Sequence, residues 1–135
     1  MIDVRQITAL HKSTVEQWHS QQVANPHRDF LYVVCEQHKY NFLLWHEEDI
    51  ARSPTACDQE IVRVKRAIDQ LNQKRNDCIE RIDDHIKRML DDKGIRPSQG
   101  ARWNTETPGA AIDRLSILAL RIYHMEEQAE RGDAS

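Results

Sequence analysis

The sequence has few of the residues that interrupt regular structure, since 135 residues include only four glycines and four prolines. This scarcity argues against a fold of many short strands joined by tight turns and favours long helices. Long hydrophobic runs are also lacking: the longest, residues 30–35, is far too short to span a bilayer, and residues 1–6 contain no apolar signal region. We therefore expect neither a membrane span nor a secretory signal peptide.

Cysteine is scarce as well, and the three present, Cys35, Cys57 and Cys78, are widely spaced. The odd number and the lack of a Cys-x-x-Cys pair argue against a disulfide framework or a zinc ribbon, so a reducing cytoplasm is the expected location. Neither sign of charge dominates, because the formal net charge is −3 and basic residues alternate with acidic ones. Nucleic acid is therefore not an expected partner.

The residues that are present predict an all-α protein. Apolar side chains recur every three or four positions, and breaks fall at Asn25-Pro26, Ser53-Pro54 and Lys93-Gly94. With 39% hydrophobic residues the chain can form one domain with its own core. We expect a single helical domain over residues 1–135, an antiparallel bundle of four main helices with short first and second connections. The predicted helices span about 3–22, 27–52, 58–92 and 107–131.

Two of these helices carry further expectations. Asp58 and Thr107 are the expected N-caps of the third and fourth helices, and Pro108 suits the first helical position. The fourth helix should be the most buried, because its apolar residues cover several faces. The third helix, roughly 50 Å long at 1.5 Å per residue, exceeds what the first can cover. Its uncovered apolar remainder predicts a homodimer.

A polar stripe on the third helix is the most distinctive feature of the sequence. Its members follow one another by three or four residues, which places them on one side of the helix, at the edge of the apolar stripe. Short acidic and amide side chains lower helix propensity there, so the stripe marks a candidate site. Its members are Asp69, Asn72, Asn76, Glu80 and Asp83.

Carboxylates in this stripe are candidate metal ligands. Glu80 and Asp83 lie one helical turn apart, so both can reach one divalent cation, and Mg²⁺ or Mn²⁺ prefers such oxygen donors. The full candidate set for the metal is Glu48, Asp77, Glu80 and Asp83. The alternative is a structural network, in which buried carboxylates and amides pair with arginines.

Three other places gather polar residues. The end of the second helix carries Trp45, Glu48, Asp49 and Arg52 on one face, although Glu48 and Arg52 also have the spacing of an ordinary stabilising pair. The start of the fourth helix and the pair formed by His124 and Glu127 are the others. The ligand-binding candidates are Trp45, Glu48, Asp49, Arg52, Asp69, Asn72, Arg75, Asn76, Trp103, Asn104, Glu106, Asp113, Arg114 and His124.

Five segments of the sequence form a recognisable pattern: WHEEDIAR at 45–52, IDxxNQxRNDxIExID at 68–83, NTET at 104–107, DRLSIL at 113–118 and YHMxxQ at 123–128. Taken together, they resemble an uncharacterised bacterial family, a domain of unknown function whose members are often encoded near cell-envelope glycosyltransferases. The resemblance covers nearly the whole chain and implies a cytoplasmic, mostly helical protein connected to lipopolysaccharide or surface-glycan assembly. It brings no catalytic residues.

The function expected from the resemblance and the polar residues is an accessory or binding protein for envelope glycan synthesis. A groove between the second, third and fourth helices would hold an anionic sugar or a segment of a glycosyltransferase. Charge-assisted hydrogen bonds would come from the arginines, and a sugar ring would stack on tryptophan. The residues in these roles are Arg52, Arg75, Arg114, Trp45 and Trp103.

A looser likeness to the all-α nucleotide pyrophosphohydrolases supports an alternative function. Glu80 and Asp83 match the form of one of their acidic pairs, whereas Glu47, Glu48 and Asp49 are adjacent rather than spaced like the other pair. The alternative is a Mg²⁺- or Mn²⁺-dependent hydrolase of a phosphorylated sugar or a nucleotide. No nucleophile motif, glycine-rich phosphate loop or H-E-x-x-H motif is present. An enzyme and a binding protein both stay open at this point.

Overall fold

The computed structural model describes residues 2–94 and 106–130. The predicted all-α bundle is confirmed, and each helix begins and ends within two residues of its predicted bounds. None of the helices in these ranges combines the length and apolarity that crossing a bilayer requires. The described residues form the four helices α1 (Val4–Ser20), α2 (Asp29–Arg52), α3 (Asp58–Asp92) and α4 (Pro108–Glu130).

Capping at two helix starts shows where local sequence was decisive. Thr107 Oγ1 accepts a hydrogen bond from the Ala110 N–H at 3.2 Å, and Pro108 is the first residue of α4, so this predicted cap is confirmed. Asp58 was the expected N-cap of α3, but it is the first helical residue, and Cys57 occupies the cap position without a side-chain bond to a backbone N–H of the helix. There Asp58 places its negative charge in the first turn, where the helix dipole favours it.

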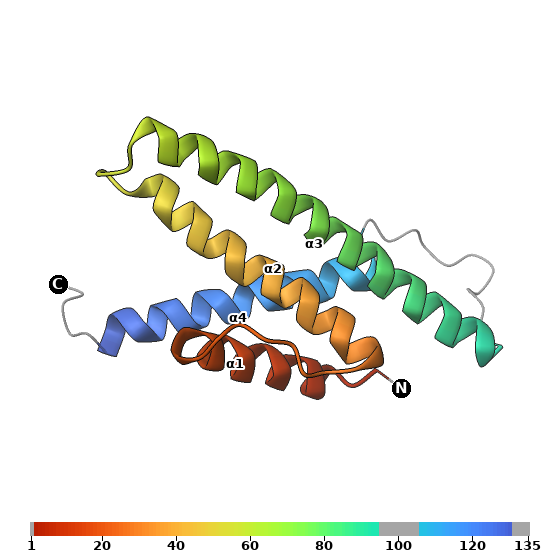
Figure 1. Cartoon of the computed structure of the whole chain (residues 1–135). Helices are drawn as coiled ribbons and strands as arrows, with labels where there is room; N and C mark the ends of the chain where they lie inside the picture. The colour runs from red at the N-terminus through yellow and green to blue at the C-terminus, as the bar shows by residue number, and fades with distance from the viewer. Residues whose placement is uncertain (1, 95–105, 131–135) are drawn as a thin grey trace.

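The helices do not simply alternate in direction (Figure 1). The expected antiparallel arrangement holds for α2 with α3 and for α3 with α4, whereas α1, α2 and α4 run in the same direction. Contacts between α2 and α4 confirm this, because Gln37 meets Gly109 and Asn41 meets Asp113, so that the numbers rise together along the two helices. The C-terminal halves of α1, α2 and α4 consequently lie toward the same end of the bundle.

The chain between α1 and α2 explains this arrangement. Residues 21–28 form an extended segment that returns along the bundle, so the first connection is longer than expected. Extended chain of that length spans roughly 26 Å, about the rise of the 17-residue α1. Hydrogen bonds tie the segment to both helices: Trp18 Nε1 donates to the Ala24 carbonyl at 3.0 Å, and Asn25 Nδ2 donates to the Tyr32 carbonyl at 2.9 Å.

The core consists of two apolar clusters with a polar layer between them. On α4, Ile112 belongs to the first cluster and Leu120 to the second, and the buried Asp113 and Ser116 lie between these residues. The first cluster contains Ile7, Val33, Val34, Cys78, Ile82, Ile86 and Ile112, and the second contains Leu10, Val15, Trp18, Cys35, Phe42 and Leu120.

The most buried helix is α2, and the expectation that it would be α4 is wrong. The face of α4 that meets α2 and α3 includes the polar residues Asp113 and Ser116, while Leu118, Ile122 and Met125 are 48–68% exposed. Burial on α4 therefore follows the hydrogen-bond partners on neighbouring helices more than the apolar pattern. The homodimer expected from an uncovered part of α3 stays a prediction.

Gly109→Ala is expected to destabilise the protein. A Cβ atom at this position would lie 2.6 Å from the Ile79 carbonyl oxygen and 3.0 Å from Asp83 Oδ1. Helix propensity alone would make the alanine variant about 1 kcal/mol more stable than the wild type. The sign of the change in the free energy of unfolding therefore separates helix propensity from steric overlap. Overpacking should lower the free energy of unfolding by about 1–3 kcal/mol in urea denaturation. Ala110→Gly is the control for propensity, and a Gly109→Ala protein as stable as the wild type would contradict this close helix contact.

Candidate functional site

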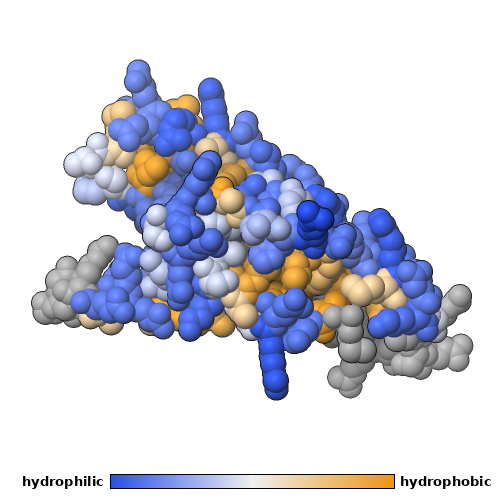
Figure 2. Space-filling model, turned by 60° about the horizontal axis from the view of Figure 1, so that its bottom comes forward, coloured by the Kyte–Doolittle hydropathy of each residue, from blue (hydrophilic) through white to orange (hydrophobic). Residues whose placement is uncertain are grey.

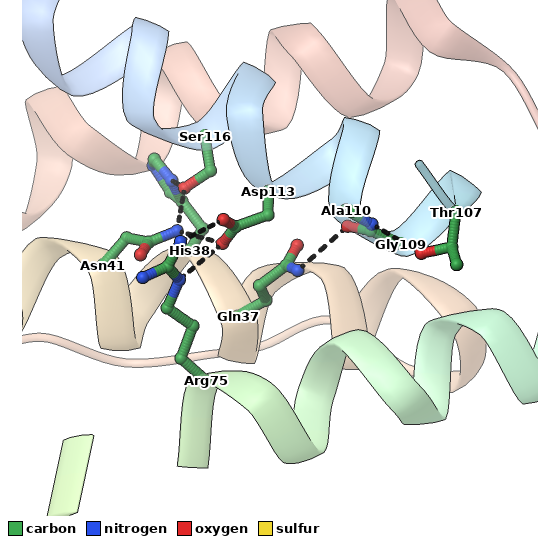
Figure 3. Close-up of polar contacts among 9 residues, drawn as sticks. All are labelled: Gln37, His38, Asn41, Arg75, Thr107, Gly109, Ala110, Asp113 and Ser116. Carbon is green, nitrogen blue, oxygen red and sulfur yellow. Dashed lines mark hydrogen bonds and ion pairs between the residues drawn. The ribbon is translucent and has the colours of Figure 1, made fainter. Parts of the chain in front are cut away.

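A chain of hydrogen bonds crosses the interior of the bundle (Figure 3). Arg75 of α3 donates from Nε to Asp113 Oδ1 of α4 at 2.9 Å and from Nη2 to Asp113 Oδ2. Asn41 Nδ2 of α2 donates to the same Oδ1 at 2.9 Å and to Ser116 Oγ at 3.1 Å. The Asp113 carboxylate thus joins three helices, and these hydrogen bonds raise the pKa of Arg75.

His38 extends this network to α1. Its Nε2 lies 2.9 Å from the His11 carbonyl oxygen, which can only accept, so Nε2 carries the proton. Its Nδ1 then accepts from the Ser116 hydroxyl at 2.6 Å. Burial is the main cause that lowers the pKa of His38 to about 3, so the ring is neutral at pH 7. A serine bonded to a neutral histidine has the form of an activated nucleophile, but both residues are 0% exposed, so we interpret the pair as structural.

The second polar group lies toward the C-terminal ends of α1, α2 and α4. These helices enclose a pocket of about 390 Å³, within the usual range for small-molecule sites. It combines four sequence-predicted candidates, Trp45, Asp49, Arg52 and His124, with residues that the sequence did not nominate as ligand contacts. Its full lining is His19, Trp45, His46, Asp49, Arg52, His124, Glu127 and Gln128.

Ring contacts hold the side chains of this pocket in place. The His124 ring stacks on Trp45 with centroids 4.5 Å apart and an interplanar angle of 11°, and the His19 ring stacks on Tyr123 at 4.2 Å. Burial, followed by the neighbouring His19, lowers the pKa of both His46 and His124. These two imidazoles are therefore neutral at pH 7, and each keeps a nitrogen lone pair that can accept a hydrogen bond or bind a ligand.

Three of the pocket residues form a group of side chains that could bind a metal ion. His19, His124 and Glu127 each offer one ligand atom, and these atoms lie within 4.8 Å of one another. The spacing of His124 and Glu127 was visible in the sequence, because residues three apart share a helix face. His19 was missed: a single histidine at the end of α1 gives no signal until the helix directions are known.

The carboxylates proposed from the sequence as metal ligands have other surroundings. No three of them come within 4.8 Å of one another in the part of the chain that the structure describes. Glu48, Asp77 and Glu80 are exposed, and Asp77 accepts a hydrogen bond from Gln73 Nε2 at 3.0 Å. Asp83 Oδ1 accepts from the Gly109 N–H at 2.7 Å, so it satisfies an otherwise unpaired donor in the first turn of α4.

The remaining candidates are spread over the surface or already paired. Arg52 pairs with Asp49 at 2.7 Å instead of with Glu48, and Arg114 pairs with Glu106 at 2.6 Å. Arg75 and Asp113 belong to the interior network. On the polar stripe of α3, Asp69, Asn76 and Glu80 are exposed, while Asn72 and Asp83 are half-buried. Trp103 and Asn104 lie outside the described residues.

An apolar groove of about 230 Å³ also lies between α1 and α4. The lining of this groove includes Val15, Leu115, Leu118 and Ile122, and the buried His11 also contributes to it. Apolar side chains likewise gather in the middle of the face drawn in Figure 2, with hydrophilic side chains around them. The groove has few polar groups to orient a ligand, so the polar pocket is the better candidate site.

The comparisons with known proteins find one family. The family described as "Protein of unknown function (DUF4254)" matches residues 31–135, which include α2 except for its first two residues, and the whole of α3 and α4. No curated protein and no solved structure matches the chain.

Asp113→Asn is expected to lower the free energy of unfolding by about 3 kcal/mol. The substitution removes the negative charge that the half-buried Arg75 faces, and breaking a buried ion pair leaves an uncompensated charge. Asp49→Asn breaks the exposed pair with Arg52 and should change stability by less than about 1 kcal/mol. Urea denaturation of both variants measures the difference, and equal losses would show that the Asp113 network does not hold the helices together.

Acidification from pH 7 to pH 5 is expected to destabilise the protein. Burial lowers the pKa of His38 to about 3 and of His11 to about 4, below the ordinary value of 6.5. Both rings therefore stay neutral in the folded state while the unfolded chain takes up protons. The two neutral rings contribute their full stability above about pH 6.5, and this contribution is lost as the pH falls toward 4. The free energy of unfolding then falls by up to about 1.4 kcal/mol per pH unit for each ring. Denaturation midpoints that stay constant over this range would contradict the neutral interior histidines.

Proposed function

The chain belongs to this family of unknown function, and we propose that it is a binding protein whose polar pocket takes a sugar-class ligand. The observation that carries the proposal is the gathering of Trp45, Asp49, Arg52 and His124, from two helices far apart in the sequence, around one pocket of about 390 Å³. A pocket that combines an aromatic wall with a few convergent polar groups is the usual form of a small-molecule site.

The chemistry of the lining suits a sugar. Trp45 is half-buried and supplies apolar ring surface against which the C–H face of a sugar packs. The carboxylate of Asp49 and the amide of Gln128 exchange hydrogen bonds with hydroxyl groups. Arg52, paired with Asp49 in an exposed position, is available to bind a phosphate or carboxylate group on the ligand.

The biological setting of the proposal follows from the resemblance of the sequence. We place the protein in the bacterial cytoplasm as an accessory protein of envelope glycan synthesis, with a glycosyltransferase as its partner. A homodimer, as expected from the length of α3, would bury exposed apolar side chains of that helix such as Val62 and Leu90. The hydrolase alternative has less support, because its carboxylates on α3 are exposed or engaged in helix capping.

The proposal is tested with three probes: glucose, glucuronic acid and glucose 1-phosphate. We expect saturable shifts of the Trp45 indole N–H resonance in NMR titrations with the sugars. Arg52→Gln should weaken binding of the two anionic sugars about 10-fold, because a charge-assisted hydrogen bond contributes about 1.5–3 kcal/mol, and should leave glucose unaffected. Folding should be retained, since the side chains of Arg52 and Asp49 are 67% and 52% exposed.

Arg63→Gln is the matched control. The Arg63 side chain is 56% exposed on α3, outside the pocket lining, and forms an ion pair with Glu47 of α2. A response of Arg63→Gln equal to that of Arg52→Gln would show non-specific attraction of anions. The absence of a saturable Trp45 shift with all three probes would reject the sugar-binding proposal.

A further inference from the structure

The group formed by His19, His124 and Glu127 has the placement of a metal site in a helical bundle. His124 and Glu127 lie one turn apart on α4, and His19 reaches them from the last turn of α1. Ligands from facing helices commonly form the metal sites of bundles. In a tetrahedral zinc site the ligand atoms are about 3.3 Å apart, as follows from bonds of about 2.0–2.1 Å. The present separations, within 4.8 Å, need only small side-chain rotations to reach that geometry.

The hydrogen bonds of His19 leave the correct nitrogen available. Its Nδ1 lies 2.6 Å from the Val15 carbonyl oxygen, so Nδ1 carries the proton and Nε2 keeps its lone pair. An Nδ1–H bonded to a backbone carbonyl is the usual support for a metal-binding histidine. The Nε2 atoms of both His19 and His124 are buried and find no hydrogen-bond partner among the described residues. Each is therefore a donor atom that the protein itself does not satisfy.

The surrounding charge favours a cation. Apart from its histidines, the pocket is lined by the carboxylates of Asp49 and Glu127 and by a single guanidinium, that of Arg52, among the described residues. The C-terminal ends of α1, α2 and α4 lie toward the same end of the bundle, and helix C-termini carry partial negative charge. A divalent cation would reverse the negative net charge of the pocket. The pocket would then bind an anionic sugar more readily.

From these observations we propose that His19, His124 and Glu127 bind one divalent transition-metal ion, for which Zn²⁺ is the representative probe. Two imidazoles and one carboxylate suit Zn²⁺ or Fe²⁺, whereas Mg²⁺ prefers oxygen ligands alone. Three protein ligands leave a coordination position for another group. The metal site stands on its own geometry, and only its role in anchoring an anionic sugar rests on the proposed function.

The test uses the full chain with Cys57→Ser as background, because the exposed Cys57 thiol is a competing zinc ligand. Protein stripped of metal with a chelator is titrated with Zn²⁺, followed by calorimetry, and with Co²⁺, followed by visible absorption. Binding of Mg²⁺, and of Fe²⁺ under anaerobic conditions, is measured by thermal shift. We expect about one equivalent of Zn²⁺ or Co²⁺, a saturable rise in the melting temperature, and much weaker binding of Mg²⁺. His124→Gln and Glu127→Gln should each weaken binding about 10-fold or more.

His27→Gln is the matched control, since His27 is half-buried like His124 but lies before α2, outside the pocket lining. It should leave the affinity for Zn²⁺ unchanged. Equal affinity in all variants, absence of Zn²⁺ binding, or tighter binding of Mg²⁺ would overturn the proposal. Because Zn²⁺ is diamagnetic, NMR of the histidine ring signals of the folded protein gives a second measurement. The His19 and His124 signals should shift on addition of Zn²⁺ and those of His27 should not. A shift of His27 without shifts of His19 and His124 would also overturn the proposal.

The two proposals fail separately in these experiments. Metal binding is measured with the ion alone, and the sugar titrations are repeated on metal-free and Zn²⁺-loaded protein. Binding of Zn²⁺ without a response to any sugar would support the metal site and reject the sugar ligand. A response of metal-free protein to sugars without any binding of Zn²⁺ would overturn the metal site and leave the sugar proposal in place.

Discussion

The burial of the Asp113 carboxylate is the constraint on which the packing of this bundle depends. A charge in a protein interior is tolerated only with partners, and those of Asp113 come from different helices, Arg75 on α3 and Asn41 on α2. Rotating α4 by one residue, about 100°, would turn the carboxylate away from both donors. The network therefore selects one rotation and one register of α4. Its contribution is to the uniqueness of the packing more than to net stability, since a buried ion pair often offsets little more than its own desolvation.

The helices joined by the interior network also form the pocket. Trp45 follows Asn41 by one turn of α2, and His124 follows Asp113 by about three turns of α4. The two helices that pair Asn41 with Asp113 also bring Trp45 against His124, with ring centroids 4.5 Å apart. Because these two helices run in the same direction, successive contacts reach the same end of the bundle, where the extended return segment has also brought the end of α1. An interior hydrogen bond and a surface pocket are parts of one packing arrangement.

The sequence predicted what depends on local periodicity and missed what depends on helix direction. Apolar spacing and the Thr107-Pro108 start located the helices to within two residues. The sequence did not reveal that residues 21–28 return along the bundle, because an extended segment and a turn have similar compositions. The groove was predicted between the second, third and fourth helices, whereas the polar pocket that contains four of the candidate residues lies between α1, α2 and α4 and includes His19. The polar stripe on α3 was predicted as a site from its residue types. Residue type alone does not distinguish the exposed Asn76 from Asp83, which caps α4.

The histidines of the chain show how the same side chain is used differently in the interior and at the pocket. His38 has a partner on each ring nitrogen, so it adds no unsatisfied group to the buried layer. His19 and His124 each leave a buried Nε2 without a partner among the described residues, and an unsatisfied buried polar group costs about 1–3 kcal/mol. His11 also has unpartnered nitrogens, but it belongs to no group of three metal-binding side chains among the described residues. Within residues 2–94 and 106–130, it is at the pocket that two such imidazoles and a carboxylate converge, near the negative ends of parallel helices. A bound cation there would turn a local cost in stability into a binding interaction, because the groups that destabilise the metal-free fold are the ones that would coordinate the ion.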